Sequence, residues 1–367
     1  MSITQPDLAC GQIPEPDRAA YRRMQRLLRN AISPAAPLSA EQLGRLKDVA
    51  AFFAGARSAV PPEPIGRAQL VVFGAHHGIA ERVETSSRAD ATDRIAAGLA
   101  TGQSPAAVTA PRADCGVTLI DVALRGEVPG FDQRTRVREG VGRIDVEDAM
   151  DTAELERSFA LGQEAASHAI DSGADVVAPA VFGAGVELAA LAVMGRVTGI
   201  EPVALLGFEG TDDRRWVRRL SVVRDAMFRA RATGRDPAGA LRVCGGCDLV
   251  AVVGFVAEAA ARRTPIVLDG METAVAALCA DTLAPGSGEW VLPGALTPGP
   301  AHARVLRALG RRALFAINVP VGQGFQALTT LSILRSAVVI ARGCELPEPA
   351  GPQEPPEPAE AAHGDGA

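Results

Sequence analysis

The stretch QLVVFGAHHG, residues 69–78, passes from an apolar run of strand length into a loop that contains glycine. Six further apolar runs follow along the chain: GVTLIDVAL, ADVVAPA, PVALLGF, TPIVLDG, WVLPGA and RALFAINV. Segments with helical spacing separate most of them. Such continuous apolar runs are typical of strands that are buried on both faces, as in parallel sheets covered by helices. The pattern therefore predicts an α/β fold with a mostly parallel sheet wound by helices.

The two ends of the chain depart from this pattern. Residues 1–60 have helical spacing, and Ser39 and Gln42 are placed as a capping box ahead of the segment LGRLKDVAAFF. The Pro-rich segment VPPEPIGR then ends the helical part. After residue 345 the sequence is rich in Pro, Glu and Ala and has almost nothing to bury. We therefore expect residues 346–367 to form a disordered tail.

A long helix is predicted between the second and third apolar runs. Asp151 and Glu154 have the spacing of a capping box, with Asp in place of the usual Ser or Thr. Leu155 and Phe159 then begin one apolar face.

The composition argues against several classes of protein. The net charge is −6 and the arginines are scattered along the chain, which argues against nucleic acid as the main partner. No apolar run approaches the roughly 20 residues of a membrane-spanning helix, and the N-terminus has no signal-peptide pattern. The only lysine, Lys47, lies in an amphipathic helical pattern, which argues against a Schiff-base or P-loop lysine. We expect a cytoplasmic protein with no membrane contact and no cofactor.

The loops after the predicted strands favour a ligand site. Ligands of open parallel sheets bind outside the carboxyl ends of the strands. Glycine occurs in each loop of this kind: GAHHG, DVALRG, PAVFGAG, GFEGTDD, CGGCD, LDGMET and VGQGFQ. Glycine lets the backbone approach a ligand and turn free N–H groups toward an anion, although it also simply closes tight turns. The pattern favours a phosphorylated small molecule as the ligand.

Asp269 follows a strongly apolar run and should lie at the carboxyl edge of the sheet, beside Glu272. A carboxylate at this edge can bind ribose hydroxyls or take part in acid–base chemistry. The alternative is a helix N-cap, for which Asp is among the preferred residues.

Two histidines and two glutamates are further candidates. His76 and His77 end the first strand, where imidazole can bind phosphate or transfer protons; the alternative is that they are ordinary loop residues. Glu187 and Glu209 lie in Gly-rich loops and can supply carboxylates to a pocket. Each can equally be a glutamate favoured by the dipole at a helix N-terminus.

Cys244 and Cys247 form a CxxC pattern, which occurs in zinc and redox sites. No second CxxC and no His pair lies at a suitable spacing. We therefore interpret the pair as free thiols and expect no metal site.

In the order and spacing of these segments the chain resembles the nicotinate-nucleotide:dimethylbenzimidazole phosphoribosyltransferase family, which acts in assembly of the lower ligand of cobalamin. The resemblance covers most of residues 38–345. The segments that carry it are QLVVFGAHHGIAE, VREGVGRIDVEDAMDTAELERSFALGQEAASHAIDSGADVV, RRLSVVRDAMFRARA, LRVCGGCDLVAVVGFVAEAAARRTPIVLDGMETAVAAL and VPVGQGFQAL.

The resemblance implies a Rossmann-like sheet, a small helical domain made from both chain ends, and a homodimer. Residues 66–325 would then form the α/β domain, and residues 1–60 and 326–345 the small domain. It also implies a reaction in which an azole nitrogen attacks C1′ of nicotinate mononucleotide and nicotinate leaves. Binding and orientation supply most of the catalysis, and a base must remove the azole proton.

The position of that base differs in this chain. The family has a Glu between the two glycines of the loop that matches VGQG, whereas this sequence has Gln323. An amide can orient an azole but cannot accept its proton, so this change alone would slow the reaction by about 10²–10⁴ if nothing replaces the base. Further departures are His76 in place of the Asp of an Asp-His-Gly loop, and the loss of hydroxyl and Arg side chains from the loops 180–188 and 207–209. The family's acidic residue before the late helix falls at or near Gly299.

The family frame nevertheless assigns a site. The expected catalytic positions are Gln323, Asp269 and His76. The expected substrate-binding residues are His77, Gly78, Gly183, Gly185, Glu187, Gly207, Glu209, Gly245, Gly246, Gly270, Gly322 and Gly324. Three hypotheses follow: a phosphoribosyltransferase in which His76, Glu187 or Glu209 replaces lost groups; an inactive paralogue that binds nucleotide or base as a sensor or partner subunit; and an enzyme for another glycosyl transfer.

Overall fold

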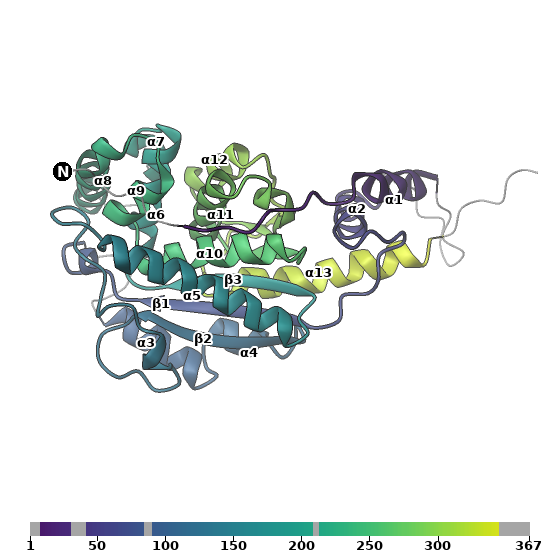
Figure 1. Cartoon of the computed structure of the whole chain (residues 1–367), viewed down its shortest axis with the longest axis horizontal. Helices are drawn as coiled ribbons and strands as arrows, with labels where there is room; N and C mark the ends of the chain where they lie inside the picture. Colours follow the sequence, from purple (N-terminus) through teal and green to yellow (C-terminus); the bar gives the residue numbers. More distant parts are fainter. Residues whose placement is uncertain (1–7, 31–41, 84–89, 208–212, 345–367) are drawn as a thin grey trace, which may run out of the picture.

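A computed structural model describes residues 8–30, 42–83, 90–207 and 213–344 (Figure 1). The main sheet of this part of the chain has five strands in the order β2-β1-β3-β4-β5, and neighbouring strands are parallel. Its strands are β1 (Ala68–Ala75), β2 (Cys115–Ala123), β3 (Val176–Phe182), β4 (Ile266–Leu268) and β5 (Val291–Pro293). A second parallel pair consists of β6 (Ala295–Leu296) and β7 (Phe315–Ala316). The predicted α/β fold with a parallel sheet is confirmed.

Helices cover both faces of the main sheet (Figure 1). The longer helices are α1 (Arg18–Asn30), α2 (Leu46–Arg57), α3 (Ala91–Ala100), α5 (Thr152–Asp171), α6 (Val186–Thr198), α8 (Asp213–Arg229), α10 (Cys247–Ala261), α11 (Met271–Leu283), α12 (Pro300–Ala308) and α13 (Phe325–Arg342). The shorter ones are α4 (Pro105–Thr109), α7 (Pro202–Leu206) and α9 (Pro237–Cys244). No helix in the described part of the chain is long and apolar enough to cross a bilayer.

Alternate side chains of β1 point into two separate cores. Val71 and Phe73 belong to the core beneath α5 and α10, while Leu70 and Val72 belong to the core beneath α3, α4 and α13. This alternation is the period of two that any strand imposes. Since both faces are buried, residues 70–73 are all apolar, which explains the pattern in the sequence.

The helices α5 and α10 pack close to each other, and each contributes a glycine at the contact. A Cβ on Gly162 would lie 1.8 Å from Ala251 O, and one on Gly254 would lie 2.1 Å from Phe159 O. Neither position therefore accepts a side chain without separating the two helices.

The predicted capping box of α5 is present. Asp151 accepts a hydrogen bond from the Glu154 N–H at 2.7 Å, and Glu154 accepts one from the Asp151 N–H at 2.9 Å. This helix start is therefore specified by local sequence.

A smaller group of helices lies at one end of the sheet, where α1 and α2 pack beside the C-terminal part of α13 (Figure 1). Met24, Leu28, Ala54 and Ala341 share its core. Helices from the two ends of the described chain thus share one small core.

Two expectations about strands need correction. The run PVALLGF, residues 202–208, was expected to be a strand, but Pro202–Leu206 form helix α7, with Pro at the first helical position. The run RALFAINV contributes only the two residues of β7 to a sheet. Short apolar runs do not distinguish a buried strand from a buried helical turn. The expected capping role of Ser39 and the expected tail at 346–367 lie outside the described residues.

Candidate active site

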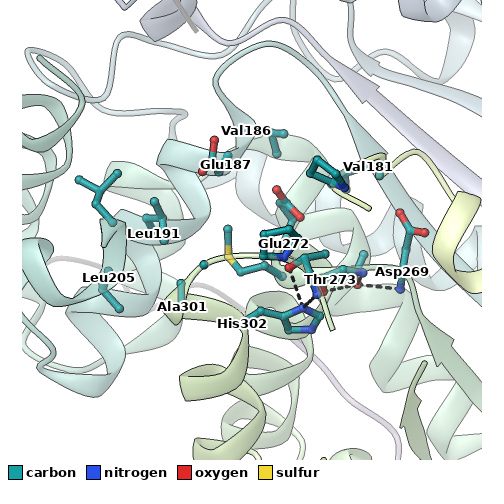
Figure 2. A pocket seen from close by; sticks show the side chains of 18 of the residues that line it. Val181, Val186, Glu187, Leu191, Leu205, Asp269, Glu272, Thr273, Ala301 and His302 are labelled. Carbon is teal, nitrogen blue, oxygen red and sulfur yellow. Dashed lines mark hydrogen bonds between the residues drawn. The ribbon is translucent and has the colours of Figure 1, made fainter. Parts of the chain in front are cut away.

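A cavity of about 900 Å³ lies at the carboxyl ends of β3, β4 and the β6–β7 pair (Figure 2). Its walls come from segments far apart in the sequence. They are Ile95 of α3 and residues 181–191 around the start of α6, 205–207 at the end of α7, 215–219 of α8, 269–273 at the start of α11, 297–302 at the start of α12, and 320–326 at the start of α13. The site thus lies where ligands of parallel α/β sheets usually bind.

Asp269 connects the end of β4 to the loop before α13. Its Oδ2 accepts a hydrogen bond from the Gly324 N–H at 2.8 Å, and its Oδ1 accepts from the Gln326 N–H at 3.0 Å and the Ala327 N–H at 3.2 Å. Burial raises the pKa of Asp269 to about 6, and these three N–H groups oppose the rise. The carboxylate therefore caps a helix, but the helix is α13 and not the helix that follows it in sequence.

The loop held by Asp269 has a left-handed backbone at two consecutive residues. Gln323 has φ +66° and Gly324 has φ +97°. A Cβ on Gly324 would lie 2.4 Å from Leu70 Cδ2, so this position requires glycine for both conformation and space. The turn places Gln323 in the cavity lining.

Two glutamates line the cavity (Figure 2). Glu187, in the first turn of α6, is held by Arg219 at 2.6 Å. Glu272, in the first turn of α11, has no ion pair with a basic side chain that the structure describes. Burial, with added repulsion from Glu187, Asp269 and Asp248, raises the pKa of Glu272 to about 7.

His302 lies at the floor of the cavity, in the first turn of α12 (Figure 2). Its Nδ1 accepts a hydrogen bond from the Thr297 N–H at 3.0 Å, so the neutral ring carries its proton on Nε2. Burial lowers the pKa of His302 to about 4, and the ring is therefore neutral near pH 7. Its Nε2 is buried and has no hydrogen-bond partner among the described residues.

Helix α8 adds cations and an aromatic ring to the lining. Arg215 and Arg219 are four residues apart and so lie on one face of the helix, with Trp216 beside them. The Arg215 Nε is buried without a hydrogen-bond partner in the described structure. Trp216 Nε1 donates to Gly207 O at 2.5 Å, which joins α8 to the end of α7.

A model of a phosphoribosyltransferase family matches residues 13–351. The chain belongs to this family. The nicotinate-nucleotide–dimethylbenzimidazole phosphoribosyltransferase of Corynebacterium efficiens is 37% identical over 324 residues, which are 88% of this chain and 86% of the relative. The enzyme of the same name from Mycobacterium avium is 37% identical over 317 residues, which are 85% of this chain and 90% of the relative.

Solved structures agree with the family assignment. The crystal structure of the nicotinate-nucleotide–dimethylbenzimidazole phosphoribosyltransferase from Thermus thermophilus superposes with a TM-score of 0.81 at 30% identity. The match covers 89% of this chain and 96% of that structure. The Rossmann-like fold of this phosphoribosyltransferase family member is thus shown by sequence and structure together.

The cavity brings together about half of the site residues that the sequence predicted. Asp269 and Gln323 line it, as do the substrate-binding candidates Gly183, Glu187, Gly207, Gly270 and Gly322. The lining does not include His76, His77, Gly78, Gly185, Gly245, Gly246 or Gly324. Glu209 lies outside the described residues. The roles of these residues stay predictions.

The two histidines of GAHHG do not reach the cavity. His76 is half-buried, with its Nε2 3.1 Å from Asp93 Oδ1 and its Nδ1 accepting the Arg125 N–H. His77 is buried, although its loop position suggested exposure, and its Nε2 lies 3.1 Å from Asp248 Oδ2. Gly246 stands beside this pair, where a Cβ would lie 2.6 Å from His77 Cε1. The side chains of His76 and His77 therefore connect secondary-structure elements outside the cavity.

The thiols of CGGC are both buried, and burial raises the pKa of Cys244 and of Cys247 to about 12. They are protonated at neutral pH, and neither lines the cavity.

Several cavity residues were missed as candidates. Arg215 and Arg219 have an i, i+4 spacing that could have identified one helix face, and His302 follows a Gly-Pro helix start in GPAHAR. Nothing in the local sequence indicated that Thr297 or Gln326 faces the same space as Asp269.

Proposed function

We propose that the chain transfers the 5-phosphoribosyl group from nicotinate mononucleotide to a benzimidazole-type base, giving an α-ribazole phosphate for the lower ligand of cobalamin. Membership of the phosphoribosyltransferase family supports the reaction type. The names of relatives that are 37% identical over most of their length support these two substrates.

The observation that carries the proposal is the mixed lining of the cavity. Arg215 and Arg219 can bind a phosphate, and the carboxylate of Glu187 can accept hydrogen bonds from ribose hydroxyls. Apolar side chains, among them Leu205 and Trp216, provide a surface for a flat azole ring. A volume of about 900 Å³ is within the range of small-molecule sites.

A second candidate function follows from one residue. Gln323 lies in the cavity at the position where the family's base is expected, and its amide accepts no proton near pH 7. A paralogue that binds nucleotide or base without turnover, as a sensor or partner subunit, is the alternative that this residue favours.

The two functions differ in the release of nicotinate. The purified chain is incubated with nicotinate mononucleotide and 5,6-dimethylbenzimidazole, and free nicotinate is followed over time. We expect release that depends on the azole. Calorimetric binding of the nucleotide with no release, and with no gain from Gln323→Glu, would instead establish binding without turnover.

The proposed phosphate contact gives a separate prediction. Arg219→Met removes a cation from the cavity wall, and we expect the KM for the nucleotide to rise about 10- to 100-fold, the value of a charged hydrogen bond. Arg224→Met is the matched control, because Arg224 lies on the same helix and pairs with Asp225 at the surface. Equal KM values for the two variants would exclude Arg219 from the phosphate site.

The expected cytoplasmic location and the expected homodimer belong to this proposal as well. The location follows from the sequence pattern and the homodimer from the family resemblance, and both stay predictions.

A further inference from the structure

Glu272 is a cavity carboxylate that accepts no side-chain hydrogen bond from the residues that the structure describes. It is the second residue of α11, two positions after Gly270, and lines the cavity together with Glu187 and Gln323. In Figure 2 the labelled Glu272 lies centrally, between Glu187 and Asp269. A group that accepts the proton of a bound azole must face the cavity, so that it can contact the azole nitrogen.

The neighbouring carboxylates are all engaged by partners. Glu187 is paired with Arg219, and Asp269 accepts three backbone N–H groups. Asp248 is hydrogen-bonded to His77 in the interior. For Glu272 the described residues supply only its own backbone N–H as a donor, so its carboxylate keeps free acceptor capacity.

An unsatisfied acceptor borders the same space as the Glu272 carboxylate. A Cβ built on Gly270 would lie 3.2 Å from Gln326 Oε1 and 3.4 Å from Glu272 Oε2, so both oxygens border the space that this glycine leaves open. Gln326 Oε1 is buried and has no donor in the described structure, because the Gln326 amide nitrogen donates to Val319 O at 2.6 Å. A carboxylic acid at Glu272 would place a donor at the same space as this acceptor.

We propose that the Glu272 carboxylate, and not the residue between the glycines of the 321–324 loop, accepts the proton that the azole base loses. This assignment rests on the proposed function. A lone pair of one azole nitrogen forms the bond to C1′ of the ribosyl group. The bond from C1′ to the nicotinate ring nitrogen breaks, and its electron pair returns to that nitrogen. The proton on the other azole nitrogen passes to Glu272 and is released to water after the products leave.

The electrostatics of the cavity suit this role. Burial first, and then the negative charges of Glu187, Asp269 and Asp248, raise the pKa of Glu272 to about 7. The cation Arg219 in the lining is already paired with Glu187. A carboxylate with a pKa near the working pH is ionised in a large fraction of molecules and is still basic enough to accept a proton.

The test measures nicotinate release by Glu272→Gln with two azoles. With 5,6-dimethylbenzimidazole we expect the rate to fall by about 10²–10⁴. With 5-nitrobenzimidazole, whose ring N–H is more acidic, we expect a much smaller loss, because less help is needed to remove the proton. Nucleotide binding by calorimetry should be unchanged. Returning a carboxylate in the double variant Glu272→Gln/Gln323→Glu should recover part of the rate.

Glu258→Gln is the matched control, since Glu258 of α10 accepts from Ser167 away from the cavity, and it should keep the wild-type rate. If Glu272→Gln does not fold, Glu272→Met, a good helix former of similar length, is measured instead. If the wild-type chain releases nicotinate, two results would overturn the assignment and leave the proposed function standing. One is a full rate in the Glu272 variant, and the other is the same loss of rate with both azoles. No release by the wild-type chain would overturn the proposed function and the assignment with it.

Discussion

The protonation of Glu272 should set the rate near neutral pH, and Asp269, whose pKa is raised to about 6, titrates just below it. The pKa of Glu272 is raised to about 7, so about a tenth of the molecules carry the carboxylate at pH 6. Because the ionised form accepts the proton, nicotinate release should rise about tenfold per pH unit below 7 and level off above it. His302 does not change its protonation in this pH range, since its pKa is lowered to about 4.

The measurement is the pH profile of kcat between about pH 5 and 9, on either side of the raised pKa. The variant Glu272→Gln should be flat over the rising limb of the wild-type chain. A variant profile with the same limb would show that another group titrates.

Asp269 is a second single residue on which the site depends, because its hydrogen bonds hold the 321–324 loop in place. Asp269→Asn replaces one carboxylate oxygen with an NH₂ group. This NH₂ faces either the Gly324 N–H or the N–H groups of Gln326 and Ala327, to which it cannot serve as an acceptor. A buried donor then loses its acceptor, and the free energy of unfolding should fall by about 1–3 kcal/mol. The 321–324 loop also loses its anchor, so the KM for the nucleotide should rise.

Asp281→Asn separates these two effects. Asp281 accepts N–H groups of Gly286 and Gly288 near the opposite end of α11, and its replacement should lower stability without changing the KM. Denaturant unfolding and steady-state kinetics measure both quantities. An unchanged KM in Asp269→Asn would mean that the loop keeps its place without the carboxylate.

Among the elements, the start of α13 depends most on one backbone conformation. Gly324→Ala places a Cβ at φ +97° and 2.4 Å from Leu70 Cδ2. Left-handed strain and overpacking together should lower the free energy of unfolding by about 2–5 kcal/mol. Gly310→Ala is the matched control, because φ is +69° there and no atom lies within 4 Å of the added Cβ.

The control isolates the strain of the left-handed backbone, which should cost about 1–2 kcal/mol. Urea unfolding of both variants measures the difference. Equal losses would indicate that Leu70 moves aside, and that the close approach of β1 to this loop contributes little.

At the scale of the whole molecule, ligand binding should stabilise the fold, because the cavity wall joins segments from residue 95 to residue 326. Nicotinate mononucleotide at about 100 times its Kd should add about 2.7 kcal/mol to the free energy of unfolding and raise the Tm. Thermal unfolding over a nucleotide titration measures this, and Arg219→Met should need more nucleotide for the same shift. A Tm that does not respond at millimolar nucleotide would contradict the proposed site.

The division of the chain is a proposal at this scale. We propose residues 66–325 as the α/β domain and residues 1–60 with 326–345 as the small helical domain. The packing of α2 against α1 and α13 supports it, while α13 also packs on the sheet. The homodimer is tested by light scattering, where we expect about twice 37.9 kDa.

The sequence alone determined the features that depend on neighbouring residues. Apolar runs identified β1 and the parallel sheet, because a strand buried on both faces needs apolar side chains at successive positions. Asp151 and Glu154 identified the start of α5, since a capping box is complete within four residues. The amide of Gln323 and the Gly-rich loops were likewise identified from the sequence alone.

The tertiary structure decided which of these features meet. Asp269 accepts the N–H of Gln326, 57 residues later, and so caps α13 instead of its own helix. The same packing brings Glu272 and the arginines of α8 into the cavity and keeps His76 and His77 out of it. It also makes residues 202–206 a helix. Local patterns report periodicity, whereas the direction and neighbours of a side chain depend on how distant elements pack, and no local pattern contains that information.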